Sequence, residues 1–135
     1  MADQTERLDT FFDSLQRPDS PNNWLVAPVD FLIKPDAVAP VFPVPAPALL
    51  ETFKSVVLRP KRITLVAQSA RALHLVAATC LLRFEDDVWA LFMPVAESEA
   101  TLALYSASRV GYWDMGTNRR RLNAWIERLR YTLGA

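Results

Sequence analysis

The sequence predicts an α+β domain with a four-stranded antiparallel sheet, helices packed on one face of that sheet, and an N-terminal strap rich in proline. Four runs of strand-forming residues follow one another with short gaps, which favours an antiparallel meander. Apolar residues recur at helical spacing before and after these runs. Eight of the ten prolines lie between Pro18 and Pro47. The length of 135 residues fits a single domain of ordinary size.

The N-terminal part, residues 1–46, is predicted to be a short helix followed by the strap. Apolar residues at helical spacing predict the helix over residues 5–16. From Arg17 to Ala46 the prolines are expected to forbid regular structure. Because this segment also carries many apolar residues, we expect it to lie flat on the domain.

Residues 47–135 are predicted to form the α+β core. A helix should begin at Pro47, which suits a first helical turn, and run to about Leu58. Strands are expected over residues 62–68, 72–84, 87–94 and 101–109, with a turn from Arg83 to Asp87. A last helix should cover residues 117–132, with an apolar stripe at Leu122, Trp125, Ile126 and Leu129.

The second and third of these strands are apolar on both sides. Both faces of the sheet should therefore be covered. The two longer helices can cover one face. The other face requires either the N-terminal helix with its strap or a second copy of the protein, which would make a homo-oligomer.

Composition excludes several classes of protein. The 15 basic residues balance the 15 acidic ones, so a generally basic nucleic-acid binder is excluded. A single cysteine, Cys80, excludes a disulfide framework and a cysteine-rich zinc site, and we expect it to be a buried apolar residue. The first residues lack a secretory signal pattern, and the longest uncharged run, residues 37–50, contains four prolines. We therefore expect a cytoplasmic protein with no membrane span.

Polar residues concentrate where the last strand meets the last helix. Charge changes along the chain: residues 1–51 hold eight acidic and three basic residues, whereas residues 109–135 hold six basic and two acidic ones. At 100° per residue, Asn118 should point to the core, Arg119 and Arg121 should flank the stripe, and Arg120 should face water. The candidate ligand-binding residues of this corner are Ser106, Ser108, Arg109, Asp114, Asn118, Arg119 and Arg121.

Two interpretations of this corner remain open. Three arginines in a first helical turn oppose the helix dipole, which is expected where function or a compensating acid lies nearby. In the first interpretation, the free N–H groups of the helix start and Arg119, Arg121 or Arg109 surround a phosphate or a carboxylate. In the second, Asp114, Asp86 and Asp87 neutralise the arginines, while Asn118 and the serines cap the turn.

The other candidate catalytic and metal-binding residues give weaker evidence of a function. His74 is the only histidine, and a lone histidine in an apolar strand is expected to be structural rather than catalytic. Asp86, Asp87 and Asp114 lack ligand spacing, so we expect no metal, and no motif indicates a cofactor. Trp113, beside Asp114 in the polar turn, is expected to be partly exposed and available to a partner.

The segment from Ser106 to Arg121 reads Ser-x-Ser-Arg-x-Gly-x-x-Asp-x-Gly-x-Asn-Arg-x-Arg. This pattern resembles the signature of the DUF1499 family of small proteins. Phe84-x-Asp86 and Pro21-Asn22 are similar to further parts of that family's pattern. The resemblance implies a family without an assigned activity.

Three functional classes follow from the residues. We expect a non-catalytic binding or scaffold module, with a small anion or another protein as its partner. The first alternative is a binder of a small anionic or lipid-like ligand at the corner formed by residues 106–121. The second alternative is an enzyme of unknown class.

Overall fold

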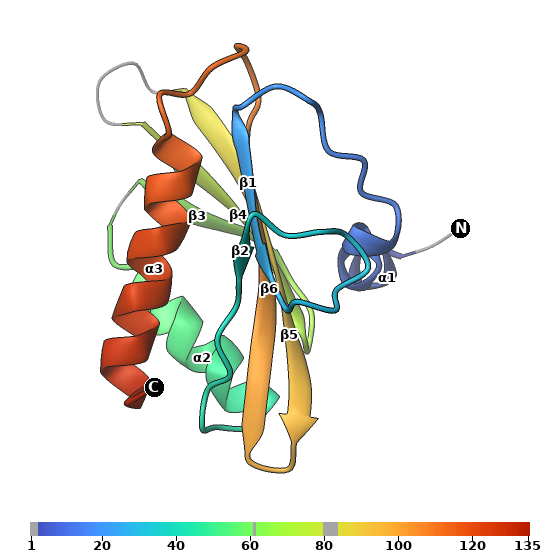
Figure 1. The fold of residues 1–135 in the computed structure, drawn as a ribbon, viewed down its shortest axis with the longest axis vertical. Helices are drawn as coiled ribbons and strands as arrows, with labels where there is room; N and C mark the ends of the chain where they lie inside the picture. Colours follow the sequence, from blue (N-terminus) through green and yellow to red (C-terminus); the bar gives the residue numbers. More distant parts are fainter. Residues whose placement is uncertain (1–2, 61, 80–83) are drawn as a thin grey trace.

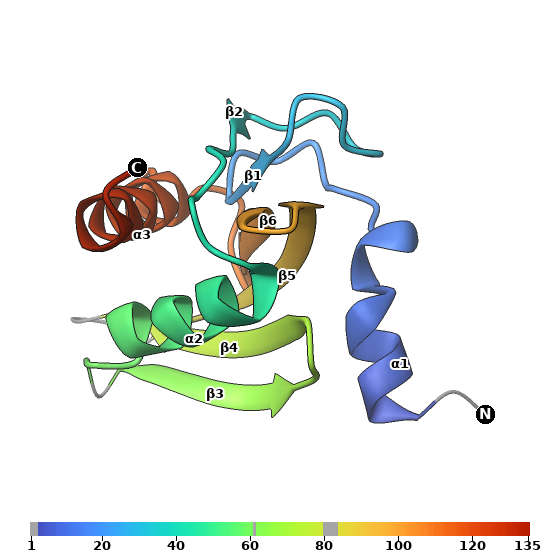
Figure 2. The ribbon, with the colours of Figure 1, turned by 90° about the horizontal axis from the view of Figure 1, so that it is seen from below.

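The computed structural model describes residues 3–60, 62–79 and 84–135. One twisted sheet of six strands, in the order β2-β1-β6-β5-β4-β3, lies between two layers (Figure 1). Helices α2 and α3 cover one face, and α1 lies on the other (Figure 2). The elements are α1 (Gln4–Asp9), the short 3-10 helix η1 (Phe11–Asp13), β1 (Asn23–Ala27), β2 (Ala37–Val38), α2 (Ala46–Val57), β3 (Ile63–Gln68), β4 (Ala72–Ala78), β5 (Glu85–Ala96), β6 (Glu99–Ser108) and α3 (Thr117–Leu133).

The α+β class is confirmed, but the sheet is mixed and six-stranded rather than antiparallel and four-stranded. Strands β3 to β6 form the expected antiparallel meander. Two further strands extend this meander beyond β6: β1 pairs antiparallel with β6, and β2 pairs parallel with β1. The expectation that prolines forbid regular structure from Arg17 to Ala46 was therefore wrong. Pro21 and Pro28 flank β1 without entering it, so every residue of that strand keeps its backbone N–H.

Two further boundaries differ from the expectation. The turn predicted from Arg83 to Asp87 is wrong in its second half, because β5 begins at Glu85 and includes both aspartates. Each aspartate lies opposite a β6 residue, and each forms an ion pair with an arginine, so a strand can hold them. The predicted N-terminal helix is divided into α1 and η1 at Thr10. The second strand, predicted over residues 72–84, is shorter than expected, because β4 ends at Ala78 and neither Thr79 nor Phe84 belongs to a strand. Residues 80–83, which include Cys80, lie outside the described residues.

The main core lies between the sheet and helices α2 and α3. Phe53 of α2 contacts both Phe92 of β5 and Trp125 of α3 through ring edges, at centroid distances of 5.3 and 5.7 Å. The predicted stripe of α3 (Leu122, Trp125, Ile126 and Leu129) is buried in this core. The last helix is therefore oriented as its spacing predicts.

The second face of the sheet is covered by the chain's own N-terminal segment. Phe11 of η1 stacks on Trp89 of β5 at a centroid distance of 4.1 Å, and Phe12 contacts Phe31 edge to face. Figure 2 shows α1 on this side, opposite α2 and α3. The apolar second face, which raised the alternative of a second copy, thus has a cover within the chain. No helix in the described part of the chain is long and apolar enough to cross a bilayer.

Candidate functional site

The end of β6 and the start of α3 meet in one polar corner. Met115 and Gly116 both adopt left-handed backbone conformations, with φ of 58° and 76°, and these two residues turn the chain into α3. Asp114 then caps the helix. Its carboxylate accepts hydrogen bonds from the backbone N–H of Gly116 at 2.8 Å and of Asn118 at 3.1 Å. The N–H groups that an external anion would use are thus partly occupied by Asp114.

Asn118 is fully buried at the centre of the corner. Its Oδ1 accepts hydrogen bonds from the Ser106 hydroxyl and from Nη1 of Arg121, the latter at 2.9 Å. Its Nδ2 lies 3.1 Å from both the Asn22 carbonyl oxygen and the Ser108 hydroxyl. One side chain therefore joins α3 to β6 and to the segment before β1. The core-facing direction predicted for Asn118 is confirmed.

The three consecutive arginines have three different environments. Nη1 of Arg121 lies 2.9 Å from Oδ2 of Asp86, and these side chains are only 11% and 3% exposed. Arg119 lies over the ring of Trp24, with its guanidinium carbon 5.0 Å from the ring centroid. Arg120 is exposed and donates to the Met115 carbonyl oxygen. Asp86 thus neutralises Arg121, as the second interpretation of the sequence suggests.

Arg109 lies on the opposite face of the sheet from this corner. Its guanidinium forms two hydrogen bonds to Asp87, both at 2.9 Å, and a third to Glu85 at 2.8 Å. Asp87 also contacts Nε2 of His74 at 2.8 Å, and the His74 ring stacks on Trp89. Burial acts to raise the pKa of Asp87, but the hydrogen bonds from Arg109 and His74 outweigh it and hold that pKa below its ordinary value of 3.8.

Replacing Asp87 with asparagine is expected to flatten the acid side of the pH–stability profile. Because the folded-state pKa is lowered, the carboxylate stabilises the fold above about pH 5, and this contribution is lost as pH falls through the lowered pKa. Urea denaturation at a series of pH values measures both profiles. Glu85→Gln, which removes the exposed partner of Arg109, should keep most of the wild-type slope. Parallel profiles for wild type and Asp87→Asn would contradict the assignment.

A pocket of about 890 Å³ opens beside the corner. The pocket lies between α3 and the turn that precedes α3 on one side, and the start of β3, the end of β4 and the start of β5 on the other. Its apolar lining includes Ile63, Ala77, Phe84, Trp113, Met115 and Trp125. Its charged lining consists of Arg62, Arg120, Arg121, Arg128, Asp86 and Asp114.

Only some of the predicted site residues reach this pocket. Ser108, Asp114 and Arg121 line it. Ser106 and Asn118 are buried behind it, and Arg109 and Arg119 lie outside its lining. Three arginines of the lining, Arg62, Arg120 and Arg128, were not among the site residues predicted from the sequence. The signal for Arg128 was available, because Arg121, Ala124, Trp125 and Arg128 share one helical face by their spacing.

Three of the lining arginines have no acidic partner. Within the described ranges, no carboxylate oxygen lies within 4.0 Å of Arg62, Arg120 or Arg128. The residues outside those ranges include no Asp or Glu. Asp86 and Asp114, by contrast, are engaged with Arg121 and with the start of α3. The pocket therefore combines apolar walls with an excess of positive charge. In the part of the chain that the structure describes, no three His, Cys, Asp or Glu residues gather as a metal site would require.

Comparison with known proteins agrees with the motif of this corner. No curated protein matches the chain at a significant level. The family model described as "Protein of unknown function (DUF1499)" matches residues 13–129. This match includes the whole corner from Ser106 to Arg121, together with Asn22 and Asp86, which contact it. The chain therefore belongs to the DUF1499 family.

Proposed function

We propose that this protein is a non-catalytic binding module whose pocket beside α3 takes an amphiphilic anion. The ligand has an apolar body and one acidic group, a carboxylate or a phosphate. The observation that supports this proposal is an apolar pocket with three arginines that have no acidic partner within the described residues. Its volume falls within the range of about 300–1,000 Å³ typical of small-molecule sites.

The lining of the pocket suits both parts of such a ligand. Ile63, Ala77 and Trp125 supply apolar surface between the sheet and α3. Arg120 and Arg128 are two helical turns apart on α3 and are both exposed to solvent. An apolar chain can thus lie against the sheet while its acidic group meets the guanidinium groups at the mouth.

The positions of the titratable groups favour binding over catalysis. His74 lies on the sheet face opposite the pocket, where it contacts Asp87 and Trp89. Asp86 and Asp114 line the pocket, but the first is paired with Arg121 and the second accepts the N–H groups of the α3 start. These acids therefore support the corner and are engaged before any ligand arrives.

The proposal is tested by titration with decanoate, decan-1-ol and inorganic phosphate, each below any micelle-forming concentration. Trp113 and Trp125 line the pocket, so intrinsic fluorescence reports occupancy. We expect decanoate to bind at least about tenfold more tightly than either the neutral alcohol or phosphate, because only decanoate carries both features.

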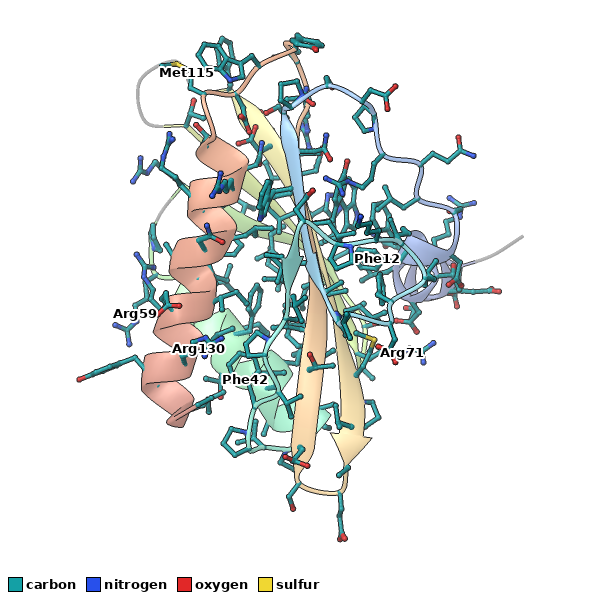
Figure 3. The ribbon with its side chains drawn as sticks, viewed as in Figure 1. Phe12, Phe42, Arg59, Arg71, Met115 and Arg130 are labelled. Carbon is teal, nitrogen blue, oxygen red and sulfur yellow. The ribbon has the colours of Figure 1, made fainter. Side chains whose placement is uncertain are left out.

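Matched variants on α3 locate the anion contact. Arg120→Ala combined with Arg128→Ala should weaken decanoate binding by about tenfold and leave decan-1-ol binding unchanged. Arg130→Ala is the control, since Arg130 is equally a helix cation but lies away from the pocket lining and near the other end of α3 from Met115 (Figure 3). Equal affinities for decanoate and decan-1-ol, or no binding of either, would overturn the proposal.

A further inference from the structure

The turn between β6 and α3 exposes an unusual number of large apolar side chains. Val110, Tyr112, Trp113 and Met115 lie within six consecutive residues, and each is at least 60% exposed. Figure 3 shows Met115 at the extreme end of the molecule, beyond the first turn of α3. Apolar side chains gathered on one exposed turn indicate an interaction surface, whereas single exposed ones do not.

Positive charge surrounds this turn. Arg120 contacts the Met115 carbonyl oxygen, and Arg62 and Arg128 line the same pocket as Trp113 and Met115. These three arginines have no acidic partner within the described ranges. The acidic residues at this end are already engaged: Glu85 and Asp87 pair with Arg109, Asp86 pairs with Arg121, and Asp114 caps α3. The acidic residues of α1 lie on the other face of the sheet from α3 (Figure 2). A chain of zero net charge thus presents one end that is apolar at its tip and cationic around it.

We propose that this end of the molecule, residues 110–115 with Arg62, Arg120 and Arg128, docks on an anionic lipid bilayer. Tyr and Trp favour the interface between headgroups and acyl chains, and arginines around them meet the acidic headgroups. The contact is peripheral, with the turn entering only the headgroup region. A second copy of the chain suits this surface less well, because it would bring the same arginines together.

This docking surface goes beyond the proposed pocket function and does not depend on it. The two are nevertheless adjacent, because Val110, Trp113 and Met115 are both exposed on the turn and part of the pocket lining. On a bilayer these three residues of the lining would face the headgroups. An amphiphilic anion could then pass between the bilayer and the pocket without crossing water.

Tyr112 separates the two proposals. It is 72% exposed on the turn and does not line the pocket. Tyr112→Ala should therefore weaken docking on vesicles and leave decanoate binding unchanged. The control is Tyr131→Ala, because Tyr131 is the same residue type, is 92% exposed, and lies near the other end of α3.

The test is co-sedimentation of the full chain with vesicles of phosphatidylcholine alone and of an equimolar mixture with phosphatidylglycerol. We expect binding to the anionic vesicles to exceed binding to the neutral ones by about tenfold and to weaken as salt is raised. Tyr112→Ala should lower binding to the anionic vesicles several-fold, whereas Tyr131→Ala should not. Circular dichroism is used to check that both variants keep the fold.

Three outcomes would overturn the docking proposal. They are equal binding to neutral and anionic vesicles, no binding to either, and equal losses for Tyr112→Ala and Tyr131→Ala. Light scattering adds a fourth, since a dimer that Tyr112→Ala abolishes would assign the turn to a second copy. Decanoate binding is measured separately, without vesicles. A failure of the pocket proposal would therefore leave the vesicle co-sedimentation result interpretable.

Discussion

Replacing Asn118 with leucine is expected to lower the free energy of unfolding by about 4 kcal/mol. Leucine fills a similar space but offers no hydrogen bond. The Ser106 hydroxyl, the Asn22 carbonyl oxygen and the Arg121 guanidinium would each lose a partner in a fully buried site. Each buried hydrogen bond that is lost costs about 1–3 kcal/mol. Arg121 keeps its contact with Asp86, and the Asn22 carbonyl oxygen keeps the backbone N–H of Ser108, so these contacts and water entry from the neighbouring pocket recover a part.

Asn123→Leu is the matched control for this substitution. Asn123 lies on the same helix, five residues further on, and is exposed. Its replacement should change stability by less than about 0.5 kcal/mol. Urea denaturation followed by circular dichroism measures both variants. Comparable losses at Asn118 and Asn123 would show that the polar corner contributes nothing beyond helix propensity.

The directions of side chains in this corner could be predicted because they follow from local geometry. Helical spacing places Asn118 in the core and Arg120 in water, and both are observed. Strand alternation places Ser106 on the face of Leu104. The same alternation puts Arg109 on the opposite face, where Asp87 holds it, so Arg109 does not share the corner with which the motif grouped it. The exposure of Trp113 follows from its place in a polar turn. Each of these predictions needs only the residues next to the one in question.

The partners that come from distant strands could not be predicted in the same way. Strand β1 pairs with β6, which lies almost at the other end of the chain, and nothing within Asn23–Ala27 reveals that pairing. The six residues between Pro21 and Pro28 are too few to distinguish a strand from an extended strap. Arg62 reaches the pocket only because β3 pairs with β4, whose end lines the same space. The pairing of β1 with β6 and the position of Arg62 in the pocket both depend on the order of strands in the sheet. No short segment of the sequence reveals that order.

The contacts observed in the corner are those of the second interpretation that the sequence left open. Arg121 is neutralised by Asp86, and Asp114 takes the first N–H groups of α3, as in the self-satisfied interpretation. Among the described residues, the pocket-lining arginines without an acidic partner lie outside this network, at Arg62, Arg120 and Arg128. The polar network therefore fixes the wall of the pocket, and our binding proposal rests on these three arginines outside it.

Replacing Arg121 with methionine tests this division, and its expected cost is about 3–5 kcal/mol. Asp86 is 2% exposed, and its Oδ2 receives no hydrogen bond from the described residues, so the charge of Arg121, 2.9 Å away, compensates that oxygen. Removing the guanidinium leaves a carboxylate without compensation in a buried position. Arg120→Met, one residue earlier and exposed, should change stability by less than about 0.5 kcal/mol in the same urea denaturation.

The double variant Arg121→Met with Asp86→Asn separates the lost ion pair from lost packing. Because it removes the uncompensated charge and keeps the shape of residue 86, it should recover about half or more of the loss caused by Arg121→Met alone. No recovery would mean that Arg121 acts through its contacts with Ser106 and Asn118 rather than through Asp86. Recovery of stability together with unchanged decanoate affinity would place Arg121 in the wall of the pocket and leave the anion contact to Arg120 and Arg128.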